Sequence, residues 1–178
     1  MARTHSTMML KVGDAAPDFL LPDTVSGESI RLSKSGVEHG SLVMFICNHC
    51  PFVVHLIEEI GNIDRDYKGR GISIFAVNSN DVEKYPDDAP NKMASLAKAQ
   101  GWSFPYLYDE SQEAATSYGA ACTPDFFLLD GSGALVFRGR MDGSSPGNEV
   151  PVTGEDLRAA LDALLAGEQV GDEQLPSL

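Results

Sequence analysis

The stretch FICNHCPFVVHLIEEIGN, residues 45–62, connects an apolar run to a segment with helical spacing. The run SLVMFI, residues 41–46, is continuously apolar, as is typical of a strand that is buried on both faces. After Pro51, apolar residues recur every three or four positions until about Tyr67, where the basic, glycine-rich segment KGRG predicts the end of a helix. The stretch therefore predicts a buried strand that leads directly into a helix, with two cysteines at the junction.

Outside this stretch, the chain is expected to alternate strands with helices, without internal repeats. Two glycine-containing turns, TVSGES at residues 24–29 and DGSG at residues 130–133, lie between apolar runs and predict hairpins. The other expected elements are strands at residues 71–78 and 104–108 and helices at residues 89–100, 110–118 and 155–165, the last capped by Thr153.

This order of elements predicts an α/β protein, a three-layer α+β sandwich with a mixed sheet. The length of 178 residues suits one domain, and we expect it to span residues 1–178 with loose ends at about 1–11 and 168–178. The segment YPDDAPN, residues 85–91, is the one surface excursion that the sequence indicates.

The composition excludes several classes of function. The net charge is −13, from 26 acidic and 13 basic residues, and such a surface repels the phosphates of nucleic acids. No apolar run approaches the ~20 residues that cross a bilayer, so we expect no membrane association. The N-terminal residues lack the apolar segment and cleavage site of a secretory signal, and we therefore expect a cytoplasmic protein.

Cys47 and Cys50 form a C-x-x-C pair in a chain that has three cysteines. In a reducing compartment, such a pair is more often catalytic or metal-binding than structural. The start of a helix presents unsatisfied N–H groups and a positive dipole, and Pro51 fits the first helical turn, so Cys50 lies where a thiolate is stabilised. Its pKa should fall from the usual value of about 8.5 toward or below neutrality. His49 either stabilises this thiolate as an imidazolium or is a solvent-facing loop residue.

The cysteines allow two other interpretations, a zinc site and a pair of inert core thiols. A zinc site with four ligands would need Cys122 and one of the histidines, and there is no second clustered pair, so we expect no metal. Two inert core thiols are less favoured still, because the pair interrupts the apolar run where two elements meet.

A second signal is AACTPDFFLLD, residues 120–130. Proline cannot donate to a sheet ladder, so Thr123-Pro124 directly before a buried strand indicates either a cis peptide or an ordinary turn before an edge strand.

Together, these features resemble the thioredoxin superfamily and, more closely, the redoxin group, the AhpC/TSA family. The chain is similar to the peroxiredoxin-like members that carry C-N-H-C-P-F. The segments that carry the resemblance are VGDAAPDFLLPDTVSGESIRLS, CNHCPFV, FAVNSND and YGAACTPDFFLLDGSGALVFRGRMD, together with the terminal helix. The resemblance implies a thioredoxin-like fold with a mixed central sheet, helices on both faces and an N-terminal β-hairpin extension.

The resemblance also assigns roles to residues. The nucleophilic cysteine of the family falls on Cys50, and the second cysteine of thioredoxins falls on Val53 and is missing. Cys47 takes the position of the peroxiredoxin Thr or Ser, and the peroxiredoxin arginine falls on Pro124, where thioredoxins have their cis-proline. Without the Thr and Arg that hold peroxide oxygens, we expect a poor fast peroxidase.

The resulting hypothesis is a thiol–disulfide oxidoreductase without a cofactor. Cys50 attacks, Cys47 resolves the mixed disulfide, and Thr123 and Pro124 form the loop that faces the substrate. The expected partners are a disulfide or peroxide substrate and an external thiol reductant that is thioredoxin-like or glutathione-like. No oligomeric state is indicated.

Two alternatives stay open. The first is a peroxidase that uses Cys50, with the sulfenic acid captured by Cys47 or Cys122. The second is a metal-binding or redox-sensing module built from Cys47, Cys50 and Cys122, with or without His49. Cys122 should lie on the side of the active site, as a second resolving thiol or, in the slightly favoured interpretation, as a packing residue.

Overall fold

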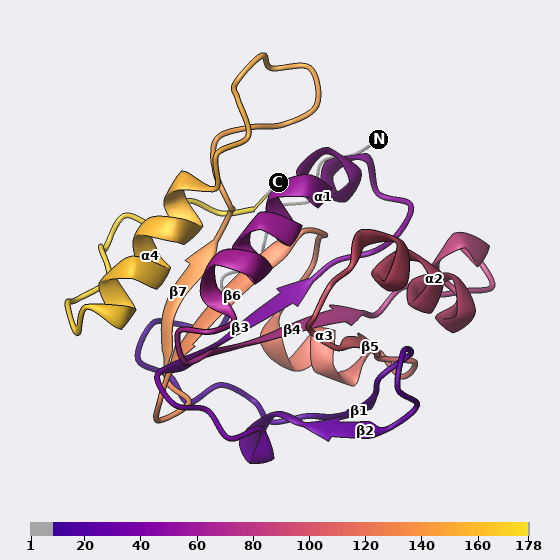
Figure 1. Ribbon diagram of the computed structural model, residues 1–178, viewed down its shortest axis with the longest axis horizontal. Helices are drawn as coiled ribbons and strands as arrows, with labels where there is room; N and C mark the ends of the chain where they lie inside the picture. Colours follow the sequence, from indigo (N-terminus) through magenta and orange to yellow (C-terminus); the bar gives the residue numbers. More distant parts are fainter. Residues whose placement is uncertain (1–8, 178) are drawn as a thin grey trace.

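The computed structural model describes residues 9–177, which are built around a five-stranded mixed sheet (Figure 1). The strand order is β5-β4-β3-β6-β7, with β3 in the centre. β3 pairs in parallel with β4, and β4 with β5, while β6 runs antiparallel to β3 and to β7. The bounds are β3 Gly40–Phe45, β4 Ile72–Asn78, β5 Tyr106–Tyr108, β6 Asp125–Asp130 and β7 Leu135–Gly139.

Helices cover both faces of the sheet because the side chains of β3 alternate between two apolar clusters. Leu42 and Met44 belong to a cluster with α1 and α4, whereas Val43 and Phe45 belong to a cluster with α3 and the N-terminal segment. Figure 1 shows the same division, with α1 and α4 on one face and α3 on the other. The helices are α1 Pro51–Tyr67, α2 Pro90–Gln100, α3 Glu113–Tyr118 and α4 Glu155–Leu165, with short 3-10 helices η1 Leu32–Lys34 and η2 Pro86–Asp88.

The expected N-terminal hairpin is present as β1 (Leu20–Pro22) and β2 (Ser29–Arg31), which pair antiparallel. It is fastened to the rest of the fold by apolar packing and by hydrogen bonds. Phe19 and Leu32 are buried at its two ends, and the carboxylate of Asp23 accepts the backbone N–H of Tyr106 at 3.1 Å. The hairpin therefore extends the protein on the α3 face, close to the edge strand β5.

Helix α1 has the bounds that its apolar spacing predicts. The buried apolar and aromatic side chains follow one face at intervals of three and four residues, and they are Val53, Leu56, Ile60, Ile63 and Tyr67. Burial of each such side chain contributes on the order of 1.5–3 kcal/mol, so the packing of this face fixes the direction in which the helix leaves β3. The helix begins at Pro51, with Cys50 as the N-cap residue.

Two expected helix starts differ from the structure. Thr153 is not the cap of α4, because Gly154 holds that position with a left-handed φ of 68°. The carboxylate of Asp142 accepts the backbone N–H groups of both Thr153 and Gly154, at 2.8 and 2.7 Å. Helix α3 begins at Glu113, later than expected, because Gln112 before it has a φ of 63°.

The C-terminal segment was expected to be loosely held, yet it lies along β7 through hydrogen bonds. The backbone N–H of Arg140 donates to the carbonyl of Leu175 at 3.0 Å. The side chain of Gln174 accepts the backbone N–H of Arg138 and donates to the carbonyl of Val136. Gly139 makes this approach possible, since a Cβ there would lie 2.3 Å from the carbonyl oxygen of Leu175. Most of the other expected loose end, residues 1–8, lies outside the described residues.

Among residues 9–177, no helix has both the length and the apolar character that crossing a membrane requires.

Candidate active site

The two cysteines of the C-x-x-C pair lie where β3 meets α1, as the sequence predicts. Cys47 is 1% exposed and packs in the apolar cluster beneath α1, whereas Cys50 is half-buried at the helix start. Both are free thiols and they lie 4.5 Å apart. The inner cysteine is thus protected from solvent, and the outer one is accessible.

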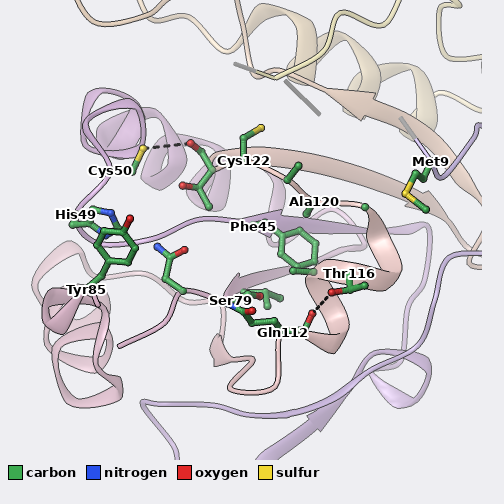
Figure 2. A pocket seen from close by; sticks show the side chains of 16 residues that line it. Met9, Phe45, His49, Cys50, Ser79, Tyr85, Gln112, Thr116, Ala120 and Cys122 are labelled. Carbon is green, nitrogen blue, oxygen red and sulfur yellow. Dashed lines mark hydrogen bonds between the residues drawn. The ribbon is translucent and has the colours of Figure 1, made fainter. Parts of the chain in front are cut away.

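The loop before β6 faces both sulfurs. The Thr123-Pro124 peptide is cis, which confirms one of the two structures expected for it. The hydroxyl of Thr123 lies 3.2 Å from Sγ of Cys47, and its carbonyl oxygen lies 3.4 Å from Sγ of Cys50, the contact that Figure 2 shows as a dashed line at Cys50. One residue therefore contacts both members of the pair.

The surroundings of the two thiols separate their pKa values. The neighbouring Cys47 thiol is the largest influence on Cys50, and together with the backbone N–H groups of Val53 and Phe52 it lowers the pKa of Cys50 to about 5 against the opposing effect of burial. The pKa of Cys47 is raised far above its usual range by the neighbouring Cys50, by burial and by the negative charge of Asp88. At neutral pH the site therefore holds one thiolate, on Cys50, and one thiol, on Cys47.

A buried carboxylate that the sequence did not reveal holds the loop between the cysteines. Asp88, at the end of η2, is 0% exposed although it belongs to the segment that we expected to be a surface excursion. It accepts the backbone N–H of Asn48 at 2.6 Å and contacts Nδ1 of His49. The amides of Asn78 and Asn80 donate to the same carboxylate, at 3.1 and 3.0 Å.

The side chain of Asn48, between the two cysteines, is hydrogen-bonded on both sides. Its side-chain amide donates to the carbonyl of Asp87 at 2.8 Å, and its side-chain oxygen accepts the hydroxyl of Tyr106 at 2.9 Å. The ring of His49 stacks on Tyr85 with centroids 4.4 Å apart and is about a quarter to a third exposed. His49 is therefore a partly exposed loop residue whose ring is held in place by Tyr85 and Asp88.

A pocket of about 500 Å³ opens beside Cys50. In Figure 2 the stacked rings of His49 and Tyr85 lie at one end, Ser79 and Gln112 lie along one side, and Cys50 and Cys122 lie along another. The wall formed by α3 and the following loop consists largely of small residues, namely Ala115, Thr116, Gly119, Ala120 and Ala121. Within residues 9–177, no Asp, Glu, Lys or Arg lines this pocket.

Cys122 shares the pocket with Cys50, on the side of the active site that the sequence indicated. Burial and the charge of Asp125 raise the pKa of Cys122 to about 12. At neutral pH it is therefore a thiol of low reactivity, in contrast to Cys50.

The residues present do not form a well-built metal site. In the described part of the chain, one group, formed by Cys47, His49 and Asp88, brings possible ligand atoms within 4.8 Å of one another. The three cysteines form no such group there. In the Cys47 group, Nδ1 of His49 is bonded to Oδ2 of Asp88, so these two atoms share a proton instead of facing a common cation.

The sequence and the fold relate this chain to known proteins. The model of the AhpC/TSA family matches residues 12–138, and the chain therefore belongs to this family. A crystal structure of an uncharacterized conserved protein from Geobacillus kaustophilus is 47% identical, with a TM-score of 0.96 over 99% of this chain and 93% of that chain. Thiol-disulfide oxidoreductase ResA of Halalkalibacterium halodurans is 27% identical over 128 residues, which are 72% of this chain and 68% of ResA.

The fold itself is shared with thioredoxin domains. The thioredoxin domain of a thiol-disulfide oxidoreductase from Bacteroides vulgatus is 19% identical and matches 72% of this chain and 88% of its own length, with a TM-score of 0.60. The thioredoxin-like α/β fold expected from the sequence is therefore confirmed. Membership of the family supports oxidoreductase chemistry with thiols and with disulfides or peroxides.

The separation of the two thiol pKa values leads to a test. In the unaltered protein, alkylation of Cys50 should accelerate as the pH rises through about 5, where the thiolate forms. Cys47→Ala removes the largest stabilising influence and should move this midpoint to higher pH. Cys47→Ser keeps a hydroxyl donor and should move it less. Iodoacetamide labelling across a pH series measures each midpoint, and an unchanged midpoint in Cys47→Ala would show that Cys47 does not stabilise the thiolate.

Proposed function

We propose that this protein is a thiol–disulfide oxidoreductase in which Cys50 is the nucleophile and Cys47 is the resolving thiol. The observation that carries the proposal is the thiolate of Cys50 at the start of α1, beside a protonated cysteine and opposite the cis Thr123-Pro124 loop. A thiolate is the attacking species in disulfide exchange, and a second thiol within reach completes the reaction.

The reaction proceeds in two exchange steps. The Cys50 thiolate attacks one sulfur of the substrate disulfide, forms a mixed disulfide and releases the other sulfur as a thiolate. Cys47 then loses its proton and attacks Sγ of Cys50, which forms the Cys47–Cys50 disulfide and releases the second substrate thiol. The substrate gains two electrons and the protein loses two, and an external thioredoxin-like or glutathione-like thiol donor returns them.

Peroxide reduction by the same Cys50 is the second candidate, and the family description supports it. The surroundings of the thiolate favour it less. Arg138 and Arg140 follow β6 in the chain, but Arg138 is 1% exposed beside Asp125, and Arg140 is paired with Asp156 at 2.7 Å. Neither lines the pocket, so among the described residues no guanidinium meets a peroxide bound at Cys50.

A metal-binding or redox-sensing role remains the third candidate. Elemental analysis of the freshly purified protein distinguishes it, since stoichiometric zinc would displace both redox proposals.

A cytoplasmic location is part of the first proposal, because a reducing compartment keeps the two thiols reduced between turnovers.

Replacement of each cysteine tests the assignment of roles. Cys50→Ser should abolish reduction of a small disulfide, because the protonated Cys47 is buried and unreactive. Cys47→Ser should still react once and then accumulate the mixed disulfide, which mass spectrometry of the intact protein detects. Cys122→Ser serves as the matched control and should keep turnover. Retained disulfide reductase activity in Cys50→Ser would refute the proposal.

The pocket and the surface charge together predict a preference among substrates. The pocket lining carries no Asp, Glu, Lys or Arg, and the net charge is −13, so an anionic disulfide finds no cationic partner there and is repelled at long range. Single-turnover rates should follow the order cystamine, hydroxyethyl disulfide, glutathione disulfide, from cationic through neutral to anionic. Added salt should narrow the differences. Fastest reaction with glutathione disulfide at low salt would contradict this preference.

A further inference from the structure

The carboxylate of Asp88 is buried beside Cys47, and each of its oxygens is fixed by two contacts. Oδ1 accepts the backbone N–H of Asn48 and the amide of Asn78, while Oδ2 accepts the amide of Asn80 and contacts Nδ1 of His49. Four contacts to polar groups satisfy a carboxylate that is 0% exposed. Asp88 is therefore a fixed acidic side chain behind the loop that carries Cys47 and Cys50.

The contact with Asp88 also orients His49. The Asp88 carboxylate faces Nδ1 of the ring, so Nε2 is the nitrogen left to exchange a proton. Stacking on Tyr85 holds the plane of the ring, and His49 lines the same pocket as Cys50. His49 is thus oriented on both sides, with its second nitrogen available at the active site.

The proton on Cys47 must be removed during the reaction, and His49 with Asp88 can accept it. The Cys47 thiol is stabilised in its protonated form, partly by the charge of Asp88, and it must lose its proton before it attacks the mixed disulfide on Cys50. Sγ of Cys47, a ring nitrogen of His49 and an oxygen of Asp88 all lie within 4.8 Å of one another. One water molecule bridges such a distance.

We propose that His49 accepts the proton of Cys47 during the resolving step and that Asp88 is the positioning residue that holds His49 for this transfer. The proton leaves Sγ of Cys47 for the His49 ring, and the imidazolium is stabilised through its Nδ1–H by Asp88. The new Cys47 thiolate attacks Sγ of Cys50, the bond between Cys50 and the substrate sulfur breaks, and that sulfur departs with the electron pair. His49 then returns the proton to the departing thiolate, so that a thiol is released. This inference depends on the two-step exchange of the proposed function.

Other ionisable groups face the same pair. Tyr85 stacks on His49, and Nζ of Lys84 lies 6.0 Å from the centroid of the Tyr85 ring. Tyr106 reaches the pair through Asn48, and Asp87 next to Asp88 is exposed and paired with Lys92 at 2.8 Å. Because Asp87 carries the same charge at the neighbouring position, it provides a matched control.

The test separates the two exchange steps with dithiodipyridine, an uncharged aromatic disulfide whose released thiopyridone absorbs light. In rapid mixing with the reduced protein, the first release reports attack by Cys50 and the second reports resolution by Cys47. Asp88→Asn should leave the first release nearly unchanged and slow the second ~100-fold at neutral pH, a typical size for the loss of general-base catalysis. The difference in the rate of the second release between Asp88→Asn and the unaltered protein should shrink as the pH rises, since hydroxide then removes the proton from Cys47.

His49→Gln should reproduce the slow second release, and Asp87→Asn should behave like the unaltered protein. The first release also reports whether each variant is folded. A second release that is unaffected in both Asp88→Asn and His49→Gln would overturn the inference. So would a deficit that is equal in both phases or constant with pH, because that pattern indicates only a structural role for Asp88. Absence of a Cys50-dependent first release in the unaltered protein would instead refute the proposed function itself.

Discussion

The stabilisation of a single negative charge on the cysteine pair is the constraint on which the chemistry of this site depends. Cys50 is a thiolate at neutral pH because the Cys47 thiol and the first amides of α1 face it, and Cys47 stays protonated for the same reason. Two neighbouring sulfurs cannot both ionise without strong repulsion. In the proposed exchange the pair is thereby divided into an attacking sulfur and a reserve thiol, and the resolving step must include a proton transfer.

The fold serves this constraint by bringing four separate segments to one place. The β3–α1 junction supplies the cysteines, and the apolar face of α1 fixes the direction of the helix whose amides face Cys50. The loop before β6 places Thr123 against both sulfurs. The segment between β4 and α2 supplies Asp88, and β5 supplies Tyr106, which bonds to the side chain of Asn48.

Much of this arrangement can be predicted from the sequence because it depends on short-range patterns. The apolar spacing after Pro51 gave the bounds of α1, and the continuous run SLVMFI indicated the central strand. The correspondence of this sequence with the motifs of the family placed Thr123-Pro124 opposite the cysteines. These features follow from periodicity and from residue types with strong local preferences.

The position of Asp88 could not be predicted in this way. YPDDAPN has the proline and acidic residues of an exposed loop, and of its two aspartates one is exposed and the other completely buried. What distinguishes them is contact with Asn48, His49, Asn78 and Asn80, which come from two other places in the chain. Likewise, the C-terminal segment carries no periodic signal, and its bonds to β7 depend on the close approach that Gly139 allows.

The measurement that tests the central claim most directly is a rapid-mixing comparison of the fully reduced protein with hydrogen peroxide and with hydroxyethyl disulfide. Loss of the Cys50 thiolate is followed in both reactions, with Cys50→Ser as the control. We expect the disulfide to react faster than peroxide, and peroxide to react with Cys50 no faster than with an ordinary free thiol. Reaction with peroxide many orders of magnitude faster than with a free thiol would contradict it and would make the protein a peroxidase.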